Sequence, residues 1–334
     1  MATGSRAPRA ASIRDVAKVA GVSHQTVSRV LNNHVSIRDE TRDRVLAAMA
    51  ELQYRPNAAA RALSTSRSKT IGVLASTRAH YGPARSIQAI EEAARERGWF
   101  VTSSSVAEPD EASLRAALAN LFDQDIEALV VIAPQQRVFE TIADLAPQVP
   151  YVTLRSIGTG DDTALRVDEI AGARLATRHL LDLGHTTIGH LAGPRDWIEA
   201  EARMQGFLHE LTAEDLPVTV PVLGDWTADF GYRAGLQLLR WRDITAYFCS
   251  NDAMAIGLMH AARDLGLDVP GDVSIIGYDD IPEAAHLWPP LTTIRQDFAE
   301  LGRRCLTVLL GDDAGPASIV PELVVRGTTA PPRS

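Results

Sequence analysis

A short stretch near the amino terminus carries a high density of hydrogen-bonding side chains. The segment GVSHQTVSRVLNN covers residues 21–33, and after its first three residues it is predicted to be a helix. Its outer side carries polar groups: Ser23, His24, Gln25, Thr26, Ser28, Arg29 and Asn32. The other side carries only Val27, Val30 and Leu31. Such a helix suits the DNA major groove, where each base pair shows a distinct donor and acceptor pattern; a solvated surface helix is the alternative.

The neighbouring residues predict the elements that would position this helix. Ser12 and Asp15 fit the S-x-x-D capping pattern, so a helix should begin there and run to about Ala20, where Gly21 ends it. A third helix is predicted over about 39–51, with apolar residues at helical spacing: Val45, Leu46, Met49 and Leu52. Two helices joined by a glycine turn and supported by a third form a helix-turn-helix domain.

Within this domain each polar residue has an expected task. His24 and Gln25 begin the second helix and should reach base edges, while Arg29 can pair with guanine or phosphate. The remaining residues predicted at the DNA suit phosphates and local caps: Ser12, Ser23, Thr26, Ser28 and Asn32.

An alanine-rich segment, NAAARALSTSRS, follows Pro56. Asn57 can cap a short helix that reaches about Leu63, and a helix of one or two turns is only marginally stable alone in water. Leu63 is the single large apolar residue there, which is unusual for an exposed linker. We expect the segment to fold when DNA and a partner chain supply contacts.

The distribution of charge separates the amino-terminal part from the rest. Residues 1–70 hold 12 positive and 5 negative side chains, whereas the remainder holds 21 positive and 37 negative ones. A basic head on an acidic body is expected when only the head meets a polyanion. The 334 residues suit two or three domains, and no apolar run is long enough to span a membrane. With two distant cysteines and no signal peptide, a cytoplasmic protein is expected.

Beyond residue 69, apolar strands alternate with amphipathic helical stretches. Seven strands are predicted, over 70–76, 127–133, 151–156, 187–193, 220–225, 246–250 and 273–280. Nearly continuous apolar strands with intervening helices indicate parallel sheets covered on both faces. The fold class is therefore α/β, with a helix-turn-helix head and a body of two doubly wound subdomains. A ligand should lie in the cleft between them, at the carboxyl ends of the strands.

The sequence resembles the LacI/GalR family of transcription regulators. The resemblance is dense in SIRDVAKVAGVSHQTVSRVLNN, TRDRVLAAMAELQYRPNAAARAL and SKTIGVLAS, and again in LGHTTIGHLAGP, SNDAMAIG, IIGYDD and PPLTTIRQDF. It implies a periplasmic-binding-protein fold for the body. It also implies that the hinge helices of two subunits pair in the DNA minor groove, where Leu63 wedges between base steps and Ala60 faces the same groove.

The resemblance further implies a ligand pocket. Its residues are matched one by one in this sequence: Ser76, His80, Tyr81, Arg155, Arg203, Trp226, Asn251, Asp279, Gln296 and Phe298. Arg, Asn and Asp supply paired donors and acceptors for vicinal hydroxyls, and Trp226 can lie against the C–H face of a sugar ring. Trp197 and Glu199 can add to the pocket, with interdomain packing as the alternative for Trp197. Because Arg155 stands where the family's lactose-sensing member has an aspartate on its sugar, the identity of the sugar stays open.

Other chemistries find no support in the residue patterns. The spacing of His179, His185 and His190 suits no common zinc site, and a surface or capping role is expected for them. The Gly158-Thr159-Gly160 run lacks the third glycine of a nucleotide loop, and no G-x-S-x-G elbow occurs. We therefore expect neither an enzyme nor a cofactor or metal.

The predicted domains are a disordered tail (1–11), a helix-turn-helix domain (12–56), a hinge and linker (57–68) and a ligand-binding and dimerisation domain (69–330). The expected function is repression of carbohydrate genes at a palindromic operator in double-stranded DNA, with release by a mono- or disaccharide. A purine-corepressed regulator and a sugar-binding transport protein remain alternatives, and the sign of the ligand effect stays open. Family tetramers use a carboxyl-terminal leucine heptad helix, so an ending of VVRGTTAPPRS predicts a homodimer.

Overall fold

The computed structural model describes most of the chain and divides it into two compact units, residues 1–68 and 69–334. The described residues are 11–31, 34, 36–54, 67–76, 80–106, 110–133, 135–145, 148–154, 164–312, 315–316 and 318–333. Residues 1–10 of the predicted tail, the predicted hinge helix and the Gly158–Gly160 run lie outside these ranges. Within them, no helix has the length and apolar character that crossing a membrane requires.

The first unit, the head, is the predicted bundle of three helices: α1 (Ile13–Ala20), α2 (His24–Leu31) and α3 (Asp39–Glu51). The α1 helix begins with a complete capping box between Ser12 and Asp15. It ends at Gly21, whose φ of 64° lies in the left-handed region that favours glycine. Local sequence signals therefore fix both ends of α1.

Among the described residues of the head, seven apolar side chains form the buried core: Val16, Ala17, Ala20, Val27, Val30, Val45 and Ala48. The valines Val27 and Val30 of α2 lie in this core together with Val16 and Ala20 of α1. One part of the predicted periodicity of α3 is wrong, because Leu46 is 49% exposed. Val45 and Ala48, three positions apart, form the buried stripe, and this rotates Leu46 toward solvent.

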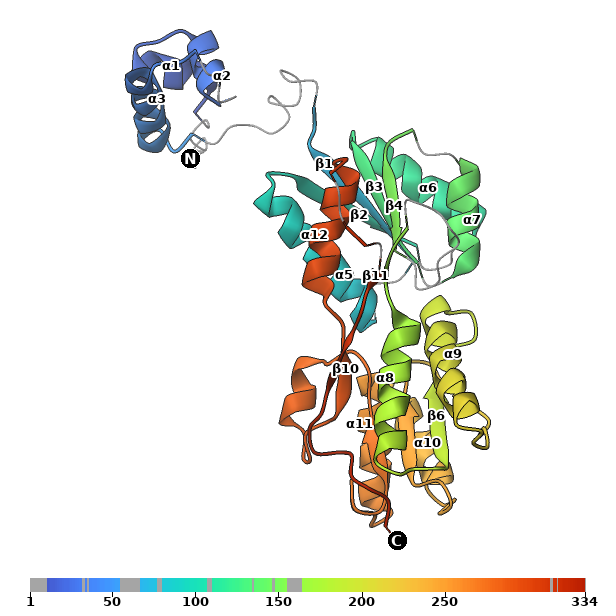
Figure 1. Ribbon diagram of the computed structural model, residues 1–334. Coiled ribbons are helices and arrows are strands. Elements are labelled where there is room, and N and C mark those ends of the chain that lie inside the picture. The colour runs from blue at the N-terminus through green and yellow to red at the C-terminus, as the bar shows by residue number, and fades with distance from the viewer. Residues whose placement is uncertain are drawn as a thin grey trace, which may run out of the picture. The chain divides into compact units, whose positions relative to one another are not determined.

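The second unit, the body, contains two parallel sheets, and the first of these belongs to subdomain 1 (Figure 1). Its strand order is β11-β5-β4-β3-β1-β2. The strands are β1 (Thr70–Ala75), β2 (Phe100–Ser105), β3 (Ala128–Ile132), β4 (Tyr151–Leu154), β5 (Ala164–Val167) and β11 (Ser318–Ile319). All of their pairings are parallel.

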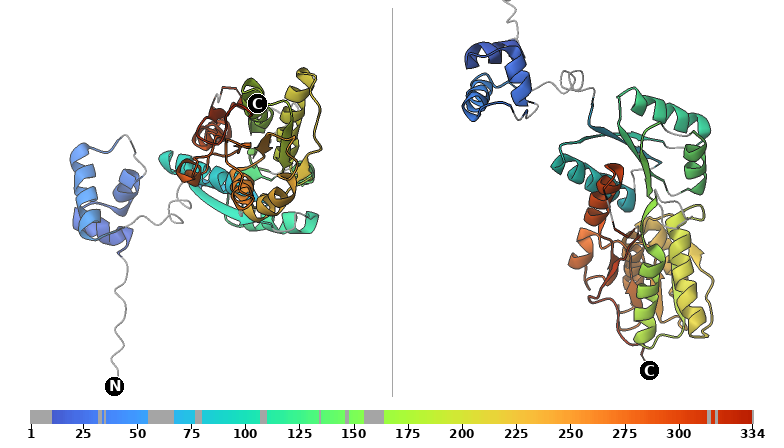
Figure 2. Two further views of the ribbon diagram at one scale, coloured as in Figure 1. Left: turned by 90° about the horizontal axis from the view of Figure 1, so that it is seen from below. Right: turned by 45° about the horizontal axis from the view of Figure 1, so that its top comes forward.

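Helices cover both faces of this sheet, as predicted. They are α5 (Tyr81–Glu96), α6 (Glu111–Phe122), α7 (Gln136–Leu145) and α12 (Phe298–Leu309). One apolar cluster joins the sheet to α5 and α12, and a second joins it to α6 and α7. The α12 helix lies beside α5 although some 200 positions of sequence separate them (Figures 1 and 2).

Subdomain 2 repeats this plan with a four-stranded parallel sheet in the order β7-β6-β8-β9. Its strands are β6 (Ile188–Ala192), β7 (Val222–Leu223), β8 (Ala246–Cys249) and β9 (Ser274–Ile276). Its helices are α8 (Glu169–Asp182), α9 (Ile198–Ala213), α10 (Ala228–Leu238) and α11 (Asp252–Asp264). Separate apolar clusters hold the α8–α9 pair and the α10–α11 pair to opposite faces of the sheet.

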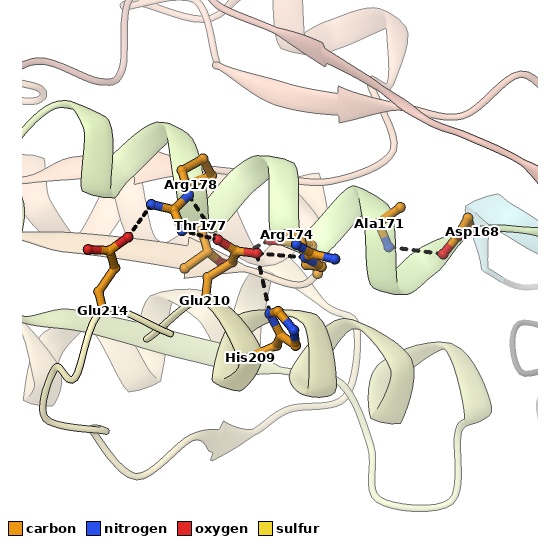
Figure 3. A network of polar contacts seen from close by, with 9 residues as sticks. Asp168, Ala171, Arg174, Thr177, Arg178, His209, Glu210 and Glu214 are labelled. Carbon is orange, nitrogen blue, oxygen red and sulfur yellow. Dashed lines mark hydrogen bonds and ion pairs between the residues drawn. The ribbon is translucent and has the colours of Figure 1, made fainter. Parts of the chain in front are cut away.

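An ion-pair network links α8 to α9 along their length (Figure 3). The buried carboxylate of Glu210 accepts hydrogen bonds from Arg174 Nε at 2.6 Å and Arg178 Nε at 2.8 Å. Arg178 also pairs with Glu214 at 2.6 Å. Gly206 lets the helices approach, because a Cβ atom there would lie 2.5 Å from the carbonyl oxygen of Ile170. Subdomain 2 therefore presents a firmly packed helix pair beside the cleft.

The chain passes between the subdomains three times. It leaves subdomain 1 from β5 into α8, returns from β10 (Thr293–Arg295) into α12, and leaves again from β11 into β12 (Glu322–Val324). The β10 and β12 strands pair antiparallel with each other. A short 3₁₀ helix, Pro282–His286, precedes the second crossing.

All seven predicted strands exist, and the described part of the chain holds five further strands that were not predicted. The β2 strand lies at the edge of its sheet and carries the polar run Thr102–Ser105. Its side chains are largely exposed or half-buried, so it lacks the apolar pattern by which a buried strand is predicted. The β5, β10, β11 and β12 strands are two to four residues long, too short for a periodic signal. The doubly wound α/β fold class is confirmed.

The contact of α10 with α11 depends on a glycine and gives a stability prediction. A Cβ atom at Gly257 would lie 2.0 Å from the carbonyl oxygen of Ala228 and 2.6 Å from the amide nitrogen of Tyr232. Gly257→Ala should therefore lower the free energy of unfolding of the body by about 1–3 kcal/mol, measured by urea denaturation of the full chain. Gly82→Ala is the control, because its Cβ would meet nothing within 4 Å. Equal stability of the two variants would contradict this packing.

Candidate DNA-reading helix and ligand cleft

The α2 helix exposes the polar side chains that the sequence singled out. His24, Gln25 and Arg29 are exposed, while Val27 and Val30 face the core of the head. This leaves an imidazole, an amide and a guanidinium on one accessible surface at the start and middle of a short helix. Those groups match the donor and acceptor chemistry of base edges and phosphates.

The other predicted DNA contacts of the head serve first as caps. Ser23 Oγ accepts a hydrogen bond from the Thr26 amide at 3.1 Å and pairs with Thr26 Oγ1 at 2.9 Å. Ser12 Oγ donates to Asp15 Oδ2 at 2.7 Å, and Ser28 is half-buried. Local capping explains Ser12, Ser23 and Thr26, and contact with phosphate stays a prediction for all four residues. Asn32, Asn57, Ala60 and Leu63 lie outside the described residues.

In the body, a cavity lies between the two subdomains at the carboxyl ends of their parallel strands. Its volume is about 90 Å³, which is room for about six waters or more and so for a molecule of monosaccharide size. Eight of the ten predicted ligand residues line it: His80, Tyr81, Arg203, Trp226, Asn251, Asp279, Gln296 and Phe298.

The two remaining predicted residues are not on its lining. Ser76 is buried at the end of β1 and donates a hydrogen bond to Gln135 Oε1 at 3.1 Å. The expectation that Ser76 lines the pocket finds no support in this geometry. Arg155 lies outside the described residues.

Arg203, on α9, forms the polar centre of the cavity and is buried. Its Nε donates to Glu169 Oε2 at 2.8 Å, and its Nη1 donates to the carbonyl oxygen of Ser250. Its guanidinium lies over the Tyr278 ring, 3.8 Å from the centroid. Burial disfavours the charged form, but the carboxylates of Glu169 and Asp279 outweigh burial and raise the pKa of Arg203. Arg203 therefore stays charged in a fixed orientation.

Asn251 has a structural task besides its place in the cavity. Its Oδ1 accepts from the amide of Met254 at 2.9 Å and so caps α11. Its Nδ2 donates to the carbonyl oxygen of Trp226 at 3.0 Å. Trp226 has a φ of 69°, a backbone conformation that a tryptophan rarely adopts without support. Asn251 thus holds the backbone of the residue whose ring lines the cavity.

Asp279 contributes a buried carboxylate that is only partly compensated. Its Oδ1 accepts from Gln296 Nε2 at 2.9 Å, and Arg203 Nη2 lies 3.7 Å from it, beyond hydrogen-bonding distance. Burial raises the pKa of Asp279 well above its ordinary value; Arg203 opposes this, and the neighbouring carboxylates of Asp252 and Glu169 reinforce it. Its φ of 117° adds backbone strain at the same residue.

Aromatic side chains form a chain across the cleft. Trp226 is buried and contacts Trp197, with ring centroids 5.4 Å apart and a T-shaped geometry. Trp197 in turn contacts His80 of subdomain 1 at 4.9 Å. Trp197 therefore does both things considered for it, lining the cavity and packing between subdomains. The indole Nε1 of Trp226 has no hydrogen-bond partner among the described residues.

Several lining residues escaped sequence reasoning. Glu169, buried in the first turn of α8, and Arg166 lack any local pattern that marks them. An apolar wall comes from Ile132, Leu154, Leu165, Val167 and Leu301. Leu165 and Val167 lie on β5, which was not predicted, so the cavity wall they form could not be predicted either. Glu199, which the sequence did suggest, lies on the lining.

The three histidines considered for a metal have other partners. His185 bridges Thr245 Oγ1 and the Ala330 carbonyl oxygen, and His179 pairs with Thr329 Oγ1 at 2.9 Å. His190 is stacked between Phe207 and Phe248, and burial lowers its pKa to about 4. The expected surface or capping role is wrong for His185 and His190, which are buried in the fold. Among the described residues, no cluster of His, Cys, Asp or Glu could hold a metal ion.

A helix-turn-helix head followed by two doubly wound subdomains around a polar cleft defines a ligand-responsive DNA-binding regulator. Residues 12–57 match the description "Bacterial regulatory proteins, lacI family", and residues 177–329 match a periplasmic binding protein-like domain. The chain belongs to the LacI family, whose members are transcription regulators and not enzymes.

Full-length relatives support this membership. The chain is 36% identical to the lactose operon repressor of Escherichia coli (strain K12) over 330 residues, which are 97% of this chain and 92% of that repressor. It is 35% identical to the HTH-type transcriptional repressor PurR of Proteus mirabilis (strain HI4320) over 335 residues, covering 96% of this chain and 97% of PurR. A crystal structure of the lac repressor dimer bound to operator and the anti-inducer ONPF matches with a TM-score of 0.85 and 35% identity, over 96% of this chain and 100% of that one.

The Arg203–Glu169 pair gives a second stability prediction. Arg203→Ala leaves the Glu169 carboxylate buried without its cation, so the free energy of unfolding should fall by about 3–5 kcal/mol in chemical denaturation. Adding Glu169→Gln removes the stranded charge and should recover part of that loss. A double variant as unstable as Arg203→Ala alone would mean that the loss has another cause.

Proposed function

We propose that this LacI-family regulator is a cytoplasmic homodimeric repressor that binds a near-palindromic operator and is released by a sugar. A twofold dimer reads twofold-related half-sites, and the exposed His24, Gln25 and Arg29 of α2 would contact each half-site. The net positive charge of residues 1–70 supports contact with phosphates. The residues that would contact the operator and the residues that would contact the sugar are both part of this proposal.

The observation that carries the sugar assignment is the pairing of a polar wall with an aromatic plate in one cavity. Arg203, Asp279 and Gln296 offer donors and acceptors for hydroxyls, and the Trp226 ring offers a surface for C–H groups. The lactose operon repressor, a relative by sequence, is named for a sugar operon, which agrees with this choice.

A groove on subdomain 2 supports the homodimer. Trp288 is 97% exposed, and it borders a groove with largely apolar walls. The groove is lined by Ile256, Met259, His260, Arg263, Leu267, Asp268, Val269, Leu287, Trp288 and Pro289. A fully exposed tryptophan beside apolar side chains is typical of a protein interface. The dimer in the matching lac repressor structure agrees with a second copy of this chain as the occupant.

Ligand binding would act through the subdomain crossings. Asp279 and Gln296 line the cavity, while Asp280 pairs at 2.7 Å with Arg295, the last residue of the β10 strand. Asp280 also pairs with Arg326, which follows β12, at 2.6 Å. Closure of the cleft would therefore move the crossing strands and reorient subdomain 1. Release follows if the sugar prefers the state with low DNA affinity, and such coupling is about 1–3 kcal/mol.

A base-reading role of α2 gives a DNA-binding prediction. Gln25→Ala should weaken operator binding by about 1–3 kcal/mol and relax the preference at one base pair, because an amide that bonds a base edge is lost. The measurement is a competition titration of operator variants at fixed salt. Gln237→Ala, an exposed glutamine of α10, is the control and should bind like the parent. Equal loss on operator and random DNA would remove the base-reading role from Gln25.

The sugar assignment is tested by a thermal-shift screen of mono- and disaccharides, with purine bases as the rival class. A bound sugar should raise the melting temperature of the parent by mass action. Trp226→Leu should then weaken that sugar by roughly tenfold, because the aromatic surface for its C–H groups is lost. Trp241→Leu, whose parent side chain is 70% exposed, should leave the affinity unchanged. Stabilisation by a purine and by no sugar would replace the proposal with the purine-sensing alternative.

A further inference from the structure

A buried carboxylate lies directly behind the polar wall of the cavity. Asp252 follows the lining residue Asn251 and is the first residue of α11, and its side chain is fully buried. It is not one of the residues that line the cavity. A buried carboxylate is unfavourable unless hydrogen bonds compensate it, so its partners indicate what it does.

Asp252 binds two segments that are distant from α11 in the sequence. Its Oδ1 accepts a hydrogen bond from Thr293 Oγ1 at 2.5 Å, and Thr293 begins the β10 strand of the second crossing. Its Oδ2 accepts from the amide of Ile281 at 2.9 Å, in the loop that follows β9. The amide of Asp252 donates to the Tyr278 carbonyl oxygen of the same loop at 2.7 Å. One residue therefore joins the start of α11 to both segments.

These two segments each carry a residue of the cavity lining. Asp279 lies on the loop between its two contacts with Asp252, and Gln296 lies three positions after Thr293. The segments also bind each other, because the Asp279 amide donates to the Ile294 carbonyl oxygen at 2.8 Å and Asp279 Oδ1 accepts from Gln296 Nε2 at 2.9 Å. The places of Asp279 and Gln296 on the lining therefore depend on how the loop and β10 are held.

The fit around the Asp252 carboxylate is tight. A Cβ atom at Gly277 would lie 2.2 Å from Asp252 Oδ1, so the carboxylate packs directly on the backbone of the loop. Thr293 is fully buried as well. An apolar side chain in place of Asp252 would leave the Thr293 hydroxyl and the Ile281 amide without this acceptor. The contact therefore requires a polar side chain of this shape.

The charge of Asp252 is poorly compensated, because both donors to its carboxylate are neutral. Burial raises the pKa of Asp252 to about 7; its two hydrogen bonds and the guanidinium of Arg326 oppose the rise, and the carboxylate of Asp280 adds to it. Asp280 itself pairs with Arg295 of β10. Other titratable groups that interact with Asp252 are Asp279, Cys249 of β8 and Tyr81 of α5. Asp252 therefore changes its charge near neutral pH.

We propose that Asp252 is a positioning residue of the ligand cleft, which holds the loop 277–281 and the second crossing in register so that Asp279 and Gln296 line the cavity together. Asp252 acts through these neighbours and not by contact with the ligand. This inference rests on the proposed function, in which the ligand acts through the crossings. It names the contact that joins the start of α11, where Asn251 supports Trp226, to β10.

Amide hydrogen exchange of the full chain tests this role. Asp252→Asn keeps both hydrogen bonds, because its amide can donate to the Thr293 hydroxyl while its oxygen accepts from the Ile281 amide. At about pH 5, where Asp252 is protonated, the variant should protect residues 277–281 and 292–296 as well as the parent does. Asp252→Ala loses both bonds and should lower the protection of these two segments by roughly tenfold or more.

The pH profile gives a readout that belongs to Asp252 alone. Its pKa is higher in the folded site than its ordinary value of about 4, so its stabilisation is fully present below about pH 4 and is lost as the pH rises to about 7. Protection in the parent should therefore fall relative to Asp252→Asn by up to about tenfold per pH unit between about pH 5 and pH 7, and the ratio should level off above that. Asp279 is present in both proteins, so its own titration cancels in the ratio.

Matched controls separate positioning from a general loss of stability. Thr293→Val removes one donor to Asp252 and should lower the protection of the same two segments at about pH 8. Thr219→Val removes a hydroxyl that donates to the Ile188 carbonyl oxygen at 2.6 Å, near the β7 edge of the sheet and opposite β9, and should leave both segments as in the parent. Asp229→Asn removes an exposed carboxylate of α10 and should keep the pH profile of the parent.

Two results would overturn the positioning role. One is a loss of protection in Asp252→Ala that is spread evenly over the body, and the other is a ratio of parent to Asp252→Asn that stays flat with pH. If Asp252→Ala fails to fold, Asp252→Asn and Thr293→Val decide. These measurements use no ligand, so their failure leaves the sugar assignment in place, and failure of the sugar screen leaves the exchange result in place.

Discussion

Burial of a guanidinium in the wall that subdomain 2 presents to the cleft is the constraint around which the cleft is organised. Arg203 reaches Glu169 at the start of α8, the Ser250 carbonyl oxygen at the end of β8, and the Tyr278 ring beyond β9. One side chain from α9 thereby joins three other elements of subdomain 2. Since a buried charge without partners is strongly unfavourable, each of these elements must keep its position for the charge to be tolerated. The polar wall of the cavity is therefore rigid before any ligand arrives.

Asn251 is a second side chain that holds several elements of the cleft in place. Its amide caps α11 and supports the left-handed backbone of Trp226, and it also lines the cavity. Residues with such double tasks cannot be replaced without affecting both the fold and the site. Asp279 differs, because its structural bonds are few and its backbone is strained. Asn251 therefore serves both the stability of the fold and the lining of the cavity. Asp279 lines the cavity at a cost in stability, because its backbone is strained.

Short-range chemistry explains what the sequence could predict. Ser12 and Gly21 mark the ends of α1 through local hydrogen bonds and a local φ preference, and the apolar strands β1, β3 and β8 identify themselves by composition. Eight cavity residues were predicted because the family resemblance supplied long-range information. Glu169 was missed, since its role depends on Arg203, 34 positions away, and no local pattern records such a pair. Leu46 was misplaced because spacing alone does not fix the rotation of a short helix.

The three crossings mean that neither subdomain is a continuous piece of chain. The α12 helix belongs with α5 and the first sheet, although the segment 177–329 that contains it matches a single domain description. A fragment of residues 177–329 alone would expose the apolar face of α12. It would also lack the first half of α8, one of the two helices shown in Figure 3. The two halves of the body are accordingly inseparable by proteolysis or by gene truncation, and a permuted or split version would have to retain all three connecting strands. In this architecture, domains can be exchanged between proteins as whole units only at the boundary between the head and the body.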